Sequence, residues 1–128
     1  MFKIVAAPMA WWPVVFCSVS EDGDVIDNEF EMRFRILDED EHVAFLIKNT
    51  SKVDDVMGKT GSAPSAVSLT LIKEIAVDWR KVAAENGEAL KFDDEHLTML
   101  LKVPNVFRAI LQAYADCRSA RPKERAGN

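Results

Sequence analysis

Alternating apolar and polar residues in the first third of the chain predict an antiparallel hairpin. From residue 29 to residue 36 an apolar side chain occupies every second position, with a charged one between, as in a strand with one buried face. The alternating apolar residues are Phe30, Met32, Phe34 and Ile36. The earlier run 14–20 is β-branched and aromatic, and the acidic turn 21–24 follows it. We expect residues 25–28 to lengthen the connection between the two strands.

The middle of the chain predicts a boundary between a strand-rich half and a helical half. After the acidic turn Asp38–Glu41, the apolar run Val43–Lys48 fits a third strand or a short helix, and we expect a strand. Residues 49–65 are polar and punctuated by glycine and proline, which predicts a loop with room for one helical turn at 53–57.

Beyond the loop the apolar period changes to that of amphipathic helices. The first helix is expected to run for about four turns on the stripe Ile72, Ile75, Ala76 and Trp79, with Ser62 or Ser65 as its cap. A second helix is expected to begin at Asp93, whose carboxylate can accept backbone N–H groups, with Phe92 and Leu97 placed as a hydrophobic staple.

A third helix is expected to open at Pro104 and to end near Ser119, because Pro122 cannot continue it. Its apolar stripe is Phe107, Ile110, Leu111 and Tyr114. The expected fold class is therefore α+β, an N-terminal antiparallel hairpin or small sheet followed by about three helices. We expect one domain over 1–118, strand-rich at 1–48 and helical at 66–118, and then a basic flexible tail at 119–128.

Composition and charge favour a folded protein of the cytoplasm. The 128 residues are 48% hydrophobic and 29% charged, with a net charge of −5, so one core can form without disulfides. The apolar run 4–16, interrupted by two prolines, is too short and too broken to span a bilayer, and it lacks the cationic lead and the proline-free apolar core of a signal peptide. Net acidity argues against nucleic-acid binding, although the basic tail leaves that alternative open.

The sequence contains no convincing set of catalytic or metal-binding residues. His96 follows Asp93, Asp94 and Glu95 directly, so their side chains point around a helix axis, whereas a zinc site needs converging ligands. Cys17 lies in an apolar strand, where its thiol would stay protonated, and we expect Cys17 and Cys117 to be free, buried or half-buried thiols. We expect no enzyme, no cofactor and no metal.

The tryptophan pair Trp11–Trp12 has two possible roles. Tryptophans bury most of their area in proteins, so packing under the sheet is the default expectation. An exposed tryptophan is instead typical of a partner-binding hot spot.

Four segments together resemble the small tail assembly chaperones that long-tailed phages encode just before the tape measure protein. The matching segments are Val77–Val82, with a tryptophan after an aspartate, Phe92–Leu97, Val106–Tyr114 and Arg33–Leu37. The resemblance covers most of the chain, although the acidic turn before Val43 and the paired tryptophans have no counterpart in it.

The resemblance implies assembly without catalysis. Such proteins bind the extended, largely helical tape measure protein, keep its apolar surface soluble and help to recruit tail tube protein, and they are absent from the finished virion. We expect a monomer or weak oligomer that binds through exposed helix faces and the basic tail. The partner-binding residues that we expect are Trp11, Trp12, Trp79, Phe107, Leu111, Tyr114, Arg118 and Arg121. The alternatives are a structural tail or head–tail joining protein that forms a ring, and a small protein–protein interaction module.

Overall fold

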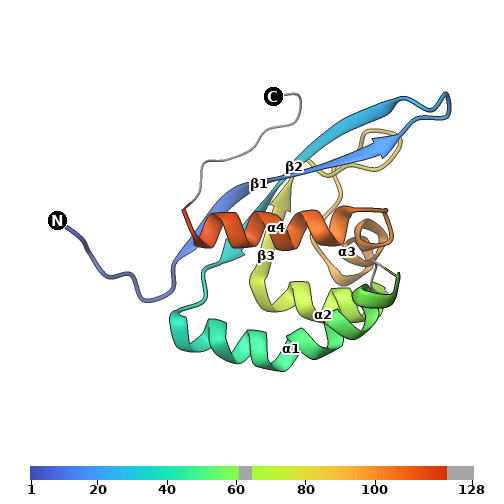
Figure 1. Cartoon of the computed structure of the whole chain (residues 1–128). Helices are drawn as coiled ribbons and strands as arrows, with labels where there is room; N and C mark the ends of the chain where they lie inside the picture. The colour runs from blue at the N-terminus through green and yellow to red at the C-terminus, as the bar shows by residue number, and fades with distance from the viewer. Residues whose placement is uncertain (61–64, 121–128) are drawn as a thin grey trace.

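A three-stranded antiparallel sheet and four helices form the part of the chain that the computed structural model describes, residues 1–60 and 65–120 (Figure 1). Side chains are described up to Asn49 and again from Ser65. The strands are β1 (Met9–Val19), β2 (Val25–Arg35) and β3 (Ala76–Arg80), in the spatial order β1-β2-β3. The α+β fold class is confirmed.

The hairpin is longer than its sequence pattern predicts. Its register runs without a break from Met9 opposite Arg35 to Val19 opposite Val25, so residues 25–28 are part of β2 and the expectation that they lengthen the connection was wrong. The turn is closed by hydrogen bonds from Ser20 N to Asp24 O, 2.8 Å, and back from Gly23 N to Ser20 O, 3.0 Å. Because the turn is this tight, the strands pair immediately after it, and the tip of the hairpin projects beyond the helices (Figure 1).

The alternation along β2 sets the inner face of the sheet. Phe30, Met32 and Phe34 are buried, whereas Arg33 and Arg35 are exposed, as the period of two requires. Helix α4 (Val106–Arg118) crosses this side of the sheet, and α2 (Ser65–Ile75) packs beside it (Figure 1). The remaining buried apolar residues are Val14, Leu37, Leu71, Ile72, Ile75, Ala76, Trp79, Leu97, Leu101, Val106, Phe107, Ile110, Ala113 and Tyr114.

Helix α1 (Glu39–Thr60) occupies the region in which we expected a third strand and a loop. The prediction of a strand at Val43–Lys48 was wrong, and so was the prediction of a loop from Asn49 as far as Thr60. Residues 61–64 lie outside the described part. The acidic turn is in fact a helix start: Asp38 Oδ1 accepts from Glu41 N at 2.8 Å, and Glu41 Oε1 accepts from Asp38 N at 3.1 Å. This reciprocal pair is a capping box, and Glu39 and Asp40 favour the positive end of the helix.

The helix that we expected to reach Trp79 ends four residues earlier, at Ile75, and the chain continues directly into β3. Strand β3 pairs with β2, with Met32 opposite Trp79 and Phe34 opposite Ala76, and the register shifts between them. Ala76 and Trp79, the last two positions of the predicted helical stripe, are therefore both buried by a strand with a bulge. Ser65 is the first residue of α2, and Ser62 lies outside the described part.

The last two helices lie close to their expected positions. Helix α3 (Asp94–Leu101) is capped by Asp93, whose Oδ1 accepts from His96 N at 2.8 Å, and the expected start is confirmed. Helix α4 starts after Asn105, just beyond Pro104, and its C-cap is Ser119. Pro122 lies outside the described part of the chain.

Candidate interaction surface

Trp79 is a core residue rather than part of an open surface. Trp79 is only 5% exposed, and its Nε1 donates a hydrogen bond to Leu90 O at 2.8 Å. The ring of Phe92 meets it edge-on, with centroids 5.2 Å apart. Since Asp93 then caps α3, this group fastens β3 to the start of α3, and we call Trp79, Leu90 and Phe92 the tryptophan clasp. The motifs that resemble the phage family thus build the fold.

Most of the expected residues on α4 also pack inward. Phe107 and Tyr114 are buried, and Leu111 is half-buried against the core. Arg118 Nε donates to Leu37 O at 3.2 Å, and its Nη2 lies 2.9 Å from Glu39 Oε1. Arg118 therefore ties the end of α4 to the start of α1. Arg121 lies outside the described part of the chain.

The two neighbouring tryptophans point to opposite faces of the sheet. Trp12 is half-buried against the core, which agrees with the expectation that it packs under the sheet. Trp11 lies on the outer face, where the Arg80 guanidinium stacks over its ring at 4.3 Å. Arg80 also pairs with the buried Glu31, and Lys81 Nζ lies 3.4 Å from the same carboxylate. The hydrogen bond from Arg80 lowers the pKa of Glu31 below its usual range, so this pair stays ionised and structural.

Helix α1 is attached by a few side chains along one stripe. Phe45 packs against the core, and both Phe45 and His42 have ring centroids 6.5 Å from that of Tyr114. At the next turn, Lys48 Nζ lies 2.6 Å from Glu74 Oε1, and Asn49 Nδ2 donates to Glu74 Oε2 at 3.1 Å. The Glu74 carboxylate of α2 therefore binds two side chains in the middle of α1.

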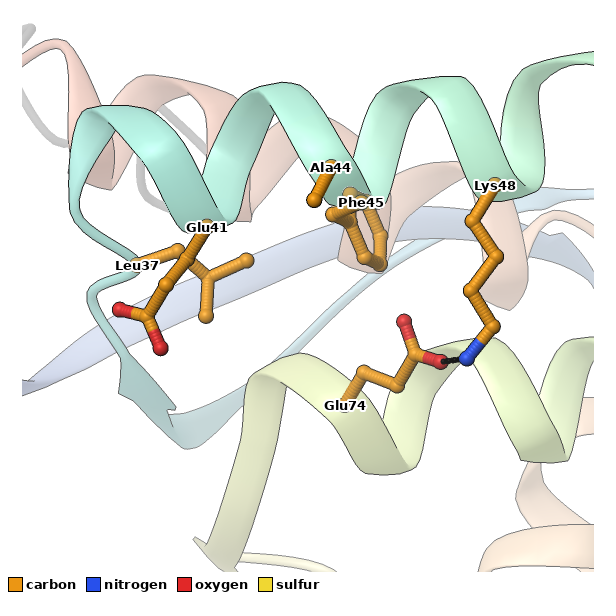
Figure 2. Close-up of a pocket in the computed structure, with 6 residues that line it drawn as sticks. All are labelled: Leu37, Glu41, Ala44, Phe45, Lys48 and Glu74. Atoms are coloured by element: carbon orange, nitrogen blue, oxygen red, sulfur yellow. Dashed lines mark hydrogen bonds and ion pairs between the residues drawn. The ribbon is translucent and has the colours of Figure 1, made fainter.

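A groove of about 290 Å³ runs between α1 and α2 on one flank of this attachment. Figure 2 shows Glu41, Phe45 and Lys48 directed from α1 toward α2, with Glu74 reaching up to Lys48. Leu37 and Ala44 complete its lining. The groove is apolar at its floor and has two carboxylates and one lysine at its rim.

An exposed apolar row lies on the other flank of α1. It consists of Val43, Leu46 and Ile47, which are 52%, 45% and 76% exposed. Positions i, i+3 and i+4 share one side of a helix, and at 100° per residue this side is turned away from Glu41 and Lys48. We call these three residues the α1 row. Because these three side chains are exposed together on one side of a helix, the α1 row is a candidate contact surface.

The α1 row was missed in the sequence because the segment was assigned to a strand. The signal that could have found it is the capping box spacing, Asp38 followed three residues later by Glu41, directly before the apolar run. Once the start of a helix is recognised there, His42, Phe45 and Asn49 form one stripe and the α1 row another.

The described side chains include no cluster of metal ligands, and the two cysteines differ in exposure. Among the side chains that the structure describes, in residues 1–49 and 65–120, no group of three or more His, Cys, Asp or Glu could hold a metal ion. Cys117 is half-buried as expected, but Cys17 is exposed, because it lies on the outer face of the projecting hairpin. The thiol of Cys17 donates to Asp27 Oδ1 at 3.3 Å, and this hydrogen bond raises its pKa, so the thiol stays protonated.

His42 predicts a pH dependence of stability. Its pKa is lowered chiefly by burial and further by nearby Arg118, against the opposing effect of Glu39. The unfolded chain takes up this proton near pH 6.5, whereas the folded chain does so only at lower pH, so stability falls as the pH drops through that interval. We expect the midpoint of urea unfolding to fall less between pH 7.5 and 5.5 in His42→Gln than in the wild type.

The matched control for this pH dependence is His96→Gln, which removes the only other histidine. Comparison with this variant separates the effect of His42 from the loss of a histidine as such. An equal decline in His42→Gln and the wild type would contradict the assignment of this effect to His42.

Comparisons of the chain with protein-family models, with curated proteins and with solved structures find no match. In the part of the chain that the structure describes, no helix has both the length and the apolar character needed to cross a membrane. The candidate site is therefore defined by geometry alone: the α1 row, with the acidic first turn of α1 at one end.

Proposed function

We propose that this protein is a tail assembly chaperone of a long-tailed phage or prophage, which binds the tape measure protein in the host cytoplasm. The observation that carries the proposal is the α1 row, three large apolar side chains exposed together on a helix that is attached by its opposite side. The resemblance of Val77–Val82 and Phe92–Leu97 to that family adds the identity of the client.

The spacing of the α1 row along one side of a helix suits the binding of an amphipathic client helix. A helix with an apolar stripe aggregates in water unless the stripe is covered, and a second helix that offers residues at i, i+3 and i+4 covers it along its length. The acidic residues Asp38, Glu39, Asp40 and Glu41 lie at the start of this helix. They favour a client segment with basic residues beside its apolar stripe and disfavour nucleic acid.

The proposed role is binding without chemistry. The chaperone covers the tape measure protein until tail tube protein assembles around it, and it is then released and does not remain in the virion. The tape measure protein is extended, so its apolar stripe offers several binding positions. Several copies of the chaperone can therefore bind along it, and each contact needs only modest affinity. The alternative, a structural tail or head–tail joining protein, would form a stable ring by itself.

The test is co-expression with the tape measure protein encoded downstream, assayed as soluble tape measure protein and as a co-eluting complex. We expect the soluble fraction to rise severalfold, with both proteins in one chromatographic peak. A tape measure protein that stays insoluble, together with a discrete ring of this chain by light scattering, would replace the chaperone by the structural-tail alternative.

A further inference from the structure

The outer face of the sheet carries an apolar column on β1. The helices pack on the inner face (Figure 1), so the β1 side chains that share the face of Trp11 point away from the core. Met9 on this face is exposed, and Trp11 and Val15 are half-buried. Because the outer side of a sheet with one packed face is usually polar, an apolar column here is a candidate contact surface.

The neighbouring outer column, on β2, is graded in charge. From one end to the other it consists of Arg35, Arg33, Glu31, Glu29 and Asp27. The two arginines and Asp27 are exposed, and Glu29 is half-buried. The central Glu31 is already paired within its own chain. The column is therefore positive toward one end and negative toward the other, with a balanced centre.

A column of this kind complements itself when it is reversed. Pro13, Glu31 and Arg80 lie side by side on the three strands. A two-fold axis above this row and parallel to it stacks a second copy face to face on the first, with its strands antiparallel. Arg33 then lies over Glu29 of the second copy, because both are two residues from Glu31. The operation is reciprocal, so this contact occurs twice.

The next charged pair fits the same register. Arg35 and Asp27 are both four residues from Glu31, so each Arg35 lies over Asp27 of the other copy. One nitrogen of Arg35 donates to Glu74 O at 3.4 Å, and the guanidinium has further N–H groups for the carboxylate. Stacking with parallel strands would instead place Arg33 over Arg33 and Asp27 over Asp27. The charges therefore select the antiparallel arrangement.

The apolar columns of the two copies also meet in this register. Trp11 lies over Val15 of the second copy and Met9 over Cys17, with Pro13 at the axis. Packed sheets lie about 10 Å apart and are turned by about 30° relative to each other, a gap that two facing layers of side chains fill. The apolar contact supplies the affinity, and the charged columns fix the orientation.

The described helices lie clear of this contact. They stay on the far sides of the two stacked sheets. After Arg35 the chain turns toward the helical side, since Leu37 is buried and α1 begins at Glu39 (Figure 1). The acidic tip of each hairpin, residues 21–24, thus extends past the end of the other copy's sheet.

We propose that the protein forms a two-fold dimer in which the outer faces of the two sheets pack on each other with antiparallel strands. This dimer does not rest on the proposed function, because it needs no client. The α1 row lies on the helical side of the sheet, so it stays accessible in both copies.

Charge reversal followed by sedimentation velocity tests the register. Arg33→Glu and, in a separate chain, Glu29→Arg each create two like-charge contacts in a dimer of identical chains. Each should raise the dimer dissociation constant at least about tenfold. An equimolar mixture of the two variants should dimerise as the wild type does, because in the mixed dimer every contact between positions 33 and 29 again joins opposite charges.

The matched control for these variants is Arg108→Glu, the same change of charge at an exposed position of α4. It should leave the dissociation constant unchanged. The proposal is overturned if the wild type is monomeric at high concentration, or if both single variants still dimerise. A mixture that stays monomeric overturns it as well, since the 33–29 contact is then absent.

Crosslinking gives an independent readout of the apolar column. In a Cys117→Ser background, a tagged chain that keeps Cys17 is mixed with an untagged chain carrying Met9→Cys and Cys17→Ser, and a short bismaleimide is added. We expect a strong band of the mixed dimer. The control replaces Met9→Cys by Val103→Cys, since Val103 and Met9 are 38% and 41% exposed. A band no stronger than that of the control contradicts the arrangement.

Two variants separate the dimer from the proposed function. Leu46→Asp with Ile47→Asp should leave the dimer dissociation constant unchanged, and a loss of dimer in this variant would place the interface on α1 and overturn the sheet contact. Arg33→Glu should lose the dimer and still keep the tape measure protein soluble. A wild-type dimer that does not bind the tape measure protein would overturn the proposed function alone.

Discussion

Replacing Trp79 by alanine is expected to lower the free energy of unfolding by about 3–5 kcal/mol, the usual cost of removing a large buried aromatic side chain. Trp79 packs beneath the sheet, meets Phe92 edge-on and donates to Leu90 O at 2.8 Å. The substitution therefore leaves a cavity and an unpaired carbonyl in the tryptophan clasp. Because whole domains are stable by only about 5–15 kcal/mol, a large part of the population should unfold at moderate urea concentrations.

The measurement is urea unfolding followed by far-ultraviolet circular dichroism. Trp11→Ala is the matched control: it removes the same side chain from a half-buried position on the outer face of the sheet, where the Arg80 stacking at 4.3 Å is lost, and it should cost about 1 kcal/mol. Trp79→Phe should fall between the two, because it keeps a ring and loses the hydrogen bond to Leu90. Equal midpoints for Trp79→Ala and Trp11→Ala would contradict the tryptophan clasp.

Charging the α1 row is expected to abolish recovery of soluble tape measure protein in the co-expression assay. Leu46→Asp with Ile47→Asp removes two apolar contacts, each worth about 1.5–3 kcal/mol when buried, or roughly tenfold to a hundredfold in affinity. It also places carboxylates where an apolar stripe should pack. Because both residues are exposed, the stability of the chaperone itself should change by no more than about 0.5 kcal/mol.

Met99→Asp is the matched control, since Met99 is a large apolar residue of similar exposure on α3. It should leave recovery of the client at the wild-type level. The prediction fails if the row variant, with an unchanged urea midpoint, still keeps the tape measure protein soluble. It also fails if Met99→Asp is equally damaging, because the client would then contact apolar surface without preference for α1.

The motifs that resemble the phage family have a structural explanation. The aspartate–tryptophan pair of Val77–Val82 lies on β3, and Phe92 and Asp93 fasten and cap α3. A surface partner cannot reach Trp79, Phe107 or Tyr114 while they are buried, so the proposed contacts are drawn from the α1 row instead. Because these motifs consist of core and cap residues, the proposed binding surface lies outside them.

The elements that arise from local interactions follow from the residues that form them. The alternation from Phe30 to Phe34 fixes a strand with one buried face, and the Asp93 carboxylate fixes the start of α3. The apolar stripe of α4 and its end at Ser119 are equally local, because helix period and capping act within a few residues. These features were predicted correctly from the residues that form them.

In two segments the local pattern is ambiguous, and contacts with distant parts of the chain select the secondary structure. Ala76 and Trp79 satisfy a helical stripe, but pairing with Phe34 and Met32 of β2 makes them a bulged strand, and that partner lies more than forty residues earlier in the chain. The run Val43–Lys48 fits strand or helix by its apolar content alone, and a capping box with inward contacts to Tyr114 and Glu74 makes it a helix. Which of its apolar residues remain in water, and so form the α1 row, follows from packing between distant parts of the chain, which periodicity does not encode.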